Sequence, residues 1–283
     1  MQLPESIKQI LDDNLSGSVT LLKRLMVALE NELLNPETND TVFIGYIEAI
    51  RSKMEMFTVI RHFCDELILS HNISSSQYPN NYFEFINEYK DFWERVPQQL
   101  LNNLQKVDDI KDKTVMLHSN SGTIREVFRL FAEESARVNI FQTLSAPAEE
   151  GRIQAHDLAN MGYDVTLIAD ALSAEKMKQT QMLILGADQI RQRTIINKTG
   201  SLQMVLAAQE FNVPVVVLTE SRKLLDFKDD ERAFRDKKRN PDEVLKEIRH
   251  PHLTAENLYF EEIPKYYINH IITEKSVMDA DDI

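Results

Sequence analysis

The sequence predicts an α/β protein with an N-terminal helical domain, residues 1–107, and a parallel-sheet domain with helices on both faces, residues 108–283. Three observations lead to this fold class. The N-terminal part carries apolar residues at helical spacing. From Asp108 onward, short apolar runs alternate with helical segments, which is typical of a parallel sheet. The length of 283 residues corresponds to about two domains.

Three helical segments are expected in the N-terminal domain. The face of the first is formed by apolar residues three or four positions apart: Val19, Leu22, Met26, Leu29 and Leu33. Ser16 or Ser18 is placed to cap that helix. Further helical patterns cover residues 41–70 and 82–107, and a turn-rich segment separates them. The aromatic residues of the last pattern are expected to lie in the core.

The second domain is expected to contain five short strands, each apolar enough to be buried on both faces. The strands are predicted at 114–117, 138–144, 164–168, 182–185 and 213–219, with helices at 123–134, 151–161, 173–178 and 202–210. A densely charged segment, residues 222–249, follows them. We interpret it as a solvent-exposed helix or segment on the surface. The alternative is a lid or a partner-binding flap over the strand ends.

Composition limits the class of function. A formal net charge of -13 argues against sequence-independent binding of nucleic acid, which needs clustered Lys and Arg. Cys64 is the single cysteine, so an intrachain disulfide is excluded, and we expect a cytoplasmic protein. No apolar run approaches the roughly 18 residues needed to span a membrane, so no membrane partner is expected.

A ligand site is expected where the strands end, because open parallel sheets bind ligands outside the carboxyl ends of their strands. Polar or glycine residues follow the first four predicted strands: His118, Ser119, Asn120, Ser121 and Gly122; then Gly151; then Asp170; then Asp188. Simpler roles stay open for several of them. Ser119, Ser121 or Asp170 can cap a helix, and His118 can be a structural histidine.

Asp188 belongs to the most informative stretch of the chain. It places a carboxylate at the edge of the sheet, and Asn197, Lys198 and Gly200 follow at short range, just before a predicted helix. An acid, an amide, a cation and a helix N-terminus suit a small phosphorylated ligand. No phosphate loop, dinucleotide fingerprint or metal-binding motif is present, so we expect neither cofactor nor metal.

The motifs Gly186-Ala187-Asp188 and Ile-Asn-Lys-Thr-Gly-Ser at 196–201 resemble those of the alpha/beta/delta-type subunits of initiation factor 2B. Methylthioribose-1-phosphate isomerase and ribose-1,5-bisphosphate isomerase are similar. The resemblance covers most of residues 110–225 and reappears at 260–264 and 271–274. It implies a helical domain followed by a Rossmann-like domain, and a homodimer or larger assembly. It also implies that Asp188 is a catalytic acid/base and that Asn197 and Lys198 hold a sugar phosphate.

Three departures from the isomerases weaken that chemistry. Ser119, after His118, stands where the resemblance places a catalytic cysteine; Ala146 replaces an arginine; and residues 15–18 replace an Arg-Gly-Ala stretch. An alcohol ionises far less readily than a thiol, whose pKa is about 8.5. We therefore expect a protein that binds a sugar phosphate or nucleotide, with altered or absent isomerase chemistry.

Two alternatives stay open. One is a non-catalytic regulatory or scaffold subunit that binds a protein partner. The other is an active aldose–ketose isomerase that uses Asp188 with Ser119 or His118.

Overall fold

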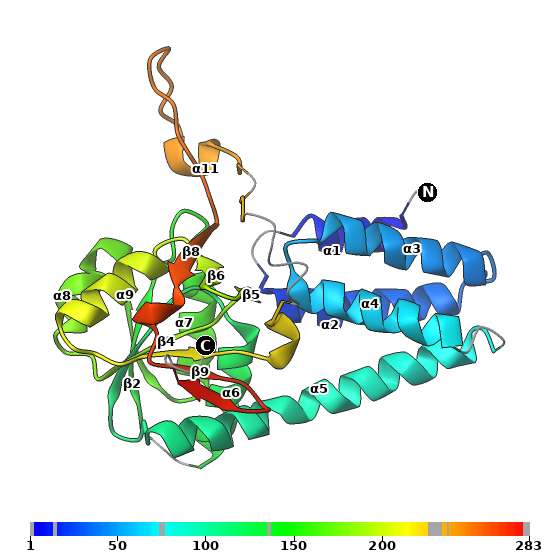
Figure 1. Cartoon of the computed structure of the whole chain (residues 1–283). Helices are drawn as coiled ribbons and strands as arrows, with labels where there is room; N and C mark the ends of the chain where they lie inside the picture. The colour runs from blue at the N-terminus through cyan, green and yellow to red at the C-terminus, as the bar shows by residue number, and fades with distance from the viewer. Residues whose placement is uncertain are drawn as a thin grey trace. The chain divides into compact units, whose positions relative to one another are not determined.

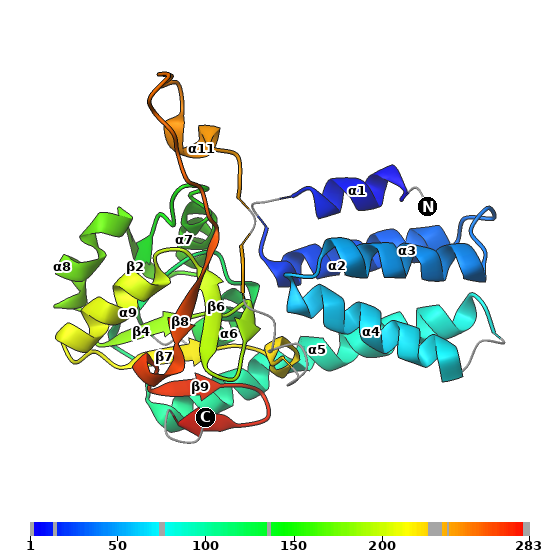
Figure 2. The same ribbon diagram turned by 45° about the horizontal axis from the view of Figure 1, so that its top comes forward.

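The computed structural model describes residues 3–13, 16–73, 77–134, 137–225, 234–236 and 238–279. They divide into two compact units, Met1–Pro97 and Gln98–Ile283 (Figures 1 and 2). Helix α5 (Asn80–Val107) crosses this division. The domain boundary expected after residue 107 lies at the end of the same helix. None of the described helices is both long and apolar enough to cross a membrane.

The first unit is helical. It consists of α1 (Glu5–Leu11), α2 (Ser18–Leu33), α3 (Asp40–Lys53), α4 (Thr58–Ile73) and the first part of α5. Its core includes Phe43, Phe63 and Cys64, all without exposed surface. Burial raises the pKa of the Cys64 thiol to about 12, so this sulfur remains a packed thiol.

The helix cap expected from Ser16 or Ser18 is wrong. Gly17 occupies the N-cap of α2 and provides no side-chain hydrogen bond. The Ser16 hydroxyl instead donates to Asp13 at 2.9 Å, and its amide donates to the same carboxylate. A local turn therefore uses the side chain that the sequence pattern assigned to the helix.

The second unit is built on a seven-stranded sheet in the order β10-β9-β7-β4-β1-β2-β3. The strands are β1 (Thr114–Leu117), β2 (Asn139–Thr143), β3 (Asp164–Ile168), β4 (Met182–Leu185), β7 (Val215–Leu218), β9 (His270–Ile272) and β10 (Val277–Asp279). Every neighbouring pair is parallel except β9 and β10. The predicted α/β fold class is confirmed.

The helices of this unit alternate with its strands as expected. They are α6 (Gly122–Glu133), α7 (Gly151–Asn160), α8 (Ser173–Met177), α9 (Ser201–Glu210) and α11 (Asp242–Leu245), with short 3-10 turns η1 (Asp170–Leu172), η2 (Ser221–Lys223) and η3 (Lys265–Tyr267).

The strand order fixes where a ligand can enter. From β1 the chain moves outward to β2 and β3, and then returns to β4 on the other side of β1. The carboxyl ends of β1 and β4 therefore form the crevice at which doubly wound sheets bind ligands, with the ends of β2 and β7 beside it.

The sequence patterns did not predict a second sheet that the structure contains. It is antiparallel and consists of β5 (Gln189–Ile190), β6 (Thr194–Lys198) and β8 (Phe260–Pro264). Asn197 and Lys198 lie at the end of β6, opposite Glu261 and Phe260 of β8. This pairing gives their side chains fixed positions beside the crevice.

The charged segment 222–249 is only partly solvated. Figure 1 shows α11 on an arm that leaves the sheet unit and returns into β8. Residues 246–250 on that arm are exposed, as expected. Arg222 and Lys223 are buried, however, so for these two residues the interpretation as a solvated surface is wrong. Residues 226–233 and 237 lie outside the described part of the chain.

Candidate functional site

His118 follows β1 and is almost completely enclosed. Its Nδ1 lies 2.6 Å from the Thr143 hydroxyl, and its Nε2 lies 3.0 Å from the carbonyl oxygen of Thr199. Because a carbonyl can only accept, Nε2 carries the proton and Nδ1 accepts from Thr143. Burial lowers the pKa of His118 to about 4, so the ring is neutral. These contacts favour the structural interpretation of His118 over the catalytic one.

Ser119 is held in an unusual backbone conformation, with φ of 67°, in the left-handed region. Its amide donates to the Ser145 hydroxyl at 2.7 Å, and Gln142 donates to its carbonyl oxygen at 3.1 Å. The Ser119 hydroxyl donates to Glu150 at 3.1 Å. A carboxylate that the sequence did not reveal therefore lies within hydrogen-bond distance of the Ser119 hydroxyl.

Glu150 also forms a buried ion pair with Lys198. The Lys198 ammonium lies 3.0 Å from Oε1 and 3.1 Å from Oε2 of that carboxylate. The same ammonium lies 4.3 Å from the centre of the Tyr259 ring. Ser119, Glu150 and Lys198 thus form one network, hereafter the Ser–Glu–Lys network, that joins the ends of β1, β2 and β6.

Asp188 follows β4 and is partly buried. Its amide donates to the Ile196 carbonyl at 2.8 Å, which holds it beside β6. Burial raises the pKa of the Asp188 carboxyl; the charge of Lys223 opposes this effect, and that of Glu150 adds to it. A carboxyl group with a raised pKa at a crevice is typical of residues that exchange protons.

Lys223 is a candidate site residue that sequence reasoning missed. It lies on η2 after β7, and the next residues run beside β5, where the Leu225 amide donates to Ile190 at 2.9 Å. Burial lowers the pKa of its ammonium group, and Asp188 opposes that effect. The charge of Glu220 opposes it as well, although no hydrogen bond or direct ion pair of this ammonium is found among the described residues.

The N-terminus of α6 lies at the end of β1. Ser121 caps the helix by accepting from the Ile124 amide at 3.3 Å, so the capping role left open for Ser121 is confirmed. The Thr123 hydroxyl donates to Glu220 at 3.0 Å, which ties α6 to the end of β7. No hydrogen bond from the Gly122 or Thr123 amide is found among the described residues, and the first amides of a helix can bind an anion.

Two buried polar atoms near these strand ends have no hydrogen-bond partner in the part of the chain that the structure describes. They are Oδ1 of Asn120, after β1, and Oγ1 of Thr219, after β7, and their residues are 7% and 0% exposed. Unpaired buried polar atoms are rare in folded proteins and need an explanation. A ligand with hydroxyl groups in the crevice would supply it.

Asp170 and Gly151 shape the loop after β2. The Asp170 carboxylate accepts from the amides of Ser145 and Ala146 at 2.8 and 2.7 Å, and Leu172 is the N-cap of α8, so the alternative that Asp170 caps this helix is wrong. A Cβ on Gly151 would lie 2.0 Å from the carbonyl oxygen of Thr143, so only glycine fits. Both residues fix the backbone of the loop after β2, which leads to Glu150.

Asn197 and Gly200 have partners within the protein. The Asn197 amide group donates to Ser201 at 2.9 Å. Gly200, with φ of 103°, and Leu202 both donate their backbone amides to Glu261 at 2.8 Å. The N-terminus of α9, which the sequence suggested for an anionic ligand, is therefore already satisfied by a protein carboxylate.

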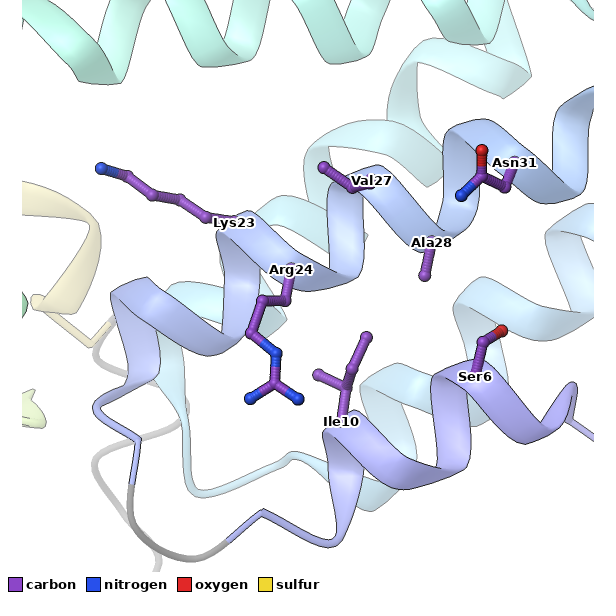
Figure 3. A pocket seen from close by; sticks show the side chains of 7 residues that line it. All are labelled: Ser6, Ile10, Lys23, Arg24, Val27, Ala28 and Asn31. Carbon is purple, nitrogen blue, oxygen red and sulfur yellow. The ribbon is translucent and has the colours of Figure 1, made fainter.

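A pocket elsewhere in the chain has a different character. It has a volume of about 470 Å³ and lies between α1 and α2, where Ile10 and Ala28 point toward one another (Figure 3). Arg24 at its edge is paired with Asp13. None of the expected site residues lines this pocket. Among the residues that the structure describes, no three His, Cys, Asp or Glu side chains are grouped to hold a metal ion.

Comparison with known proteins agrees with the resemblance noted in the motifs. The chain is 29% identical to the ribose 1,5-bisphosphate isomerase of Methanocaldococcus jannaschii, over 68% of this chain and 61% of that protein. It is 28% identical to the methylthioribose-1-phosphate isomerase of Bacillus pumilus, over 64% of this chain and 54% of that protein. The matched part spans less than two thirds of either relative.

Solved structures share the fold. The crystal structure of translation initiation factor eIF-2B from Pyrococcus horikoshii has a TM-score of 0.80 and 21% identity, and the likeness covers 99% of this chain and 100% of that one. The 5-methylthioribose 1-phosphate isomerase of the same organism gives 0.79 and 18%, over 97% and 83% of the two chains. The sequence also matches the Initiation factor 2 subunit family over residues 31–280, and this chain therefore belongs to that family.

Proposed function

We propose that this protein binds a small phosphorylated sugar at the carboxyl ends of β1, β4 and β7, and that its isomerase chemistry is altered or absent. The observation that carries the proposal is the buried Lys223 ammonium group, which forms no hydrogen bond or direct ion pair among the described residues, although the charges of Asp188 and Glu220 act on it. A buried cation that no anion contacts directly can still bind a further anionic group, and such binding would stabilise the fold.

The surroundings of Lys223 supply the other groups that such a ligand needs. The Thr123–Glu220 hydrogen bond brings the N-terminus of α6 to the end of β7, three residues before Lys223. The first amides of α6 and the helix dipole favour a phosphate there. Asn120 and Thr219 offer unpaired polar atoms to sugar hydroxyls. Relatives named as isomerases of ribose 1,5-bisphosphate and methylthioribose-1-phosphate support the same ligand class.

Calorimetry with ribose 1-phosphate, methylthioribose 1-phosphate, nucleoside monophosphates and unphosphorylated ribose tests this proposal. We expect binding of at least one phosphorylated compound, accompanied by a thermal shift, and no binding of ribose. Lys223→Met should weaken that binding about tenfold or more, because it removes the buried cation. Lys178→Met is the matched control, since Lys178 lies on the surface against Glu175. No heat with any phosphorylated compound would refute the proposal.

A second candidate function is an active aldose–ketose isomerase, which the contact between Ser119 and Glu150 favours. Proton transfer between two carbons of a sugar needs one protein group that acts as a base and one that acts as an acid toward the substrate. Asp188 and the Ser119–Glu150 pair offer both groups at neighbouring strand ends. Conversion of an aldose phosphate to a ketose phosphate, followed by NMR and lost in Asp188→Asn, would support this function.

A further inference from the structure

The Ser–Glu–Lys network bears on which sugar phosphate the site accepts. We propose that the site selects a sugar with one phosphate group, held by Lys223 and the first amides of α6, and discriminates against a sugar bisphosphate because Glu150 already occupies Lys198. This inference rests on the proposed function and narrows its ligand.

The first step concerns Lys198. Its ammonium contacts both oxygens of Glu150, and the two side chains are only 3% and 10% exposed. A phosphate could use Lys198 only by displacing Glu150. That carboxylate would then be left buried without its cation, which is strongly unfavourable. Lys198 therefore offers a second phosphate little net attraction.

The second step concerns the N-terminus of α9, directly after Lys198. The Glu261 carboxylate accepts the amides of Gly200 and Leu202 there. On this side of the crevice, a lysine and a helix N-terminus that could each bind phosphate are both neutralised by protein carboxylates. Ala146, where the family resemblance gave an arginine, adds no charge. This side suits uncharged sugar hydroxyls, which can donate to carboxylates.

The third step concerns the opposite side, formed by β7 and α6. Lys223 is buried and, unlike Lys198, forms no direct ion pair among the described residues, although the charges of Asp188 and Glu220 act on it. Within the same part of the chain, Asn120 and Thr219 carry buried polar atoms without a hydrogen-bond partner. The Lys223 ammonium, the Thr219 hydroxyl and the first amides of α6 can donate to one phosphate at this end of the crevice, whereas Asn120 Oδ1 can only accept and suits a sugar hydroxyl. Named relatives include both a bisphosphate and a monophosphate isomerase, so the family alone does not decide between these ligands.

The test measures the dissociation constants of ribose 1-phosphate and ribose 1,5-bisphosphate by calorimetry. Wild-type protein should bind the monophosphate about tenfold more tightly. Glu150→Gln frees Lys198 and should raise bisphosphate affinity about tenfold while changing monophosphate affinity less than about threefold. Glu149→Gln is the control, because this neighbouring glutamate is paired with Arg152 at the surface and should leave both constants unchanged.

The outcomes separate the two proposals. If wild-type protein binds the bisphosphate as tightly as the monophosphate or more tightly, or if Glu150→Gln weakens bisphosphate binding, this inference is wrong while the proposed function stands. If neither sugar binds, the proposed function fails as well. Circular dichroism establishes that Glu150→Gln is folded; if it is not, the wild-type ratio of the two constants decides.

Discussion

The imidazole Nε2 of His118 donates a hydrogen bond of 3.0 Å to the carbonyl oxygen of Thr199, 81 residues further along the chain. This contact joins the end of β1 to the turn between β6 and α9. Gly200, the next residue, would bring a Cβ within 3.2 Å of the same ring, so the turn is packed directly on the histidine. The second sheet is thereby held against the crevice by a neutral imidazole.

The first prediction is that acid destabilises the protein through His118. Burial lowers its pKa to about 4, whereas a histidine in the unfolded chain titrates near 6.5. Between these values the unfolded state binds the proton first, so the free energy of unfolding decreases as the pH falls. The full difference is about 3 kcal/mol.

Urea unfolding at several pH values between about 7 and 4 measures this decrease. His118→Gln should remove most of the slope, whereas His156→Gln should keep it, because His156 lies on the surface. An unchanged slope in His118→Gln would contradict the prediction.

The second prediction concerns the energetic coupling between Glu150 and Lys198. Lys198→Met leaves a buried carboxylate without its cation and should lower the free energy of unfolding by about 3–5 kcal/mol. The double variant Glu150→Gln/Lys198→Met should lose less than the sum of the two single variants, because neither charge is then left unpaired. Chemical denaturation of the four proteins gives the coupling, and a strictly additive result would argue against it.

The third prediction separates two reasons why a position requires glycine: a steric clash with a Cβ and a left-handed backbone. Gly151→Ala forces a Cβ against the Thr143 carbonyl and should destabilise the protein by about 3 kcal/mol or more. Gly162 instead has a left-handed backbone, with φ of 96°, and a Cβ there meets nothing within 4 Å. Gly162→Ala should therefore cost only about 1–2 kcal/mol. Thermal melts of both variants check the order, and equal losses would disprove the steric explanation.

The central strands were predictable because their sequences are continuous apolar runs. β1 and β4 have the bounds that the sequence predicts, since both are buried on both faces. β6 was missed because Thr194–Lys198 ends in an amide and a cation, and its partner β8 lies more than 60 residues away. Pairing over such a separation leaves no local pattern.

The residues of the candidate site divide in the same way into those that local sequence could predict and those that it could not. Asp188 could be found because it directly follows a buried strand. Glu150 and Lys223 could not, because a glutamate just before a helix and a lysine in a charged stretch both have a simpler explanation as exposed residues. Burial of Glu150 depends on Lys198, supplied by a distant strand, and burial of Lys223 depends on packing of η2 beside β5. Tertiary contacts, rather than neighbours in sequence, decide both.

The fourth prediction is that Asp188→Asn stabilises the fold while it weakens ligand binding. Burial raises the pKa of this carboxyl, so the folded state holds the proton more tightly than the unfolded state does. The ionised carboxylate is therefore a destabilising group near pH 7, and its stability deficit grows as the pH rises through the folded pKa. An uncharged amide of the same shape avoids that deficit.

We expect the melting temperature of Asp188→Asn to exceed that of wild type near pH 7, and the difference to vanish below about pH 4, where the carboxyl is protonated in both states. Binding of the sugar phosphate should weaken about 10–100-fold, because a charged acceptor is lost. Asp170→Asn is the matched contrast: its carboxylate accepts two backbone amides, so the same change should lower the melting temperature. If Asp188 serves ligand binding at the expense of stability, the two substitutions should change the melting temperature in opposite directions. If both aspartates were purely structural, both substitutions should lower it.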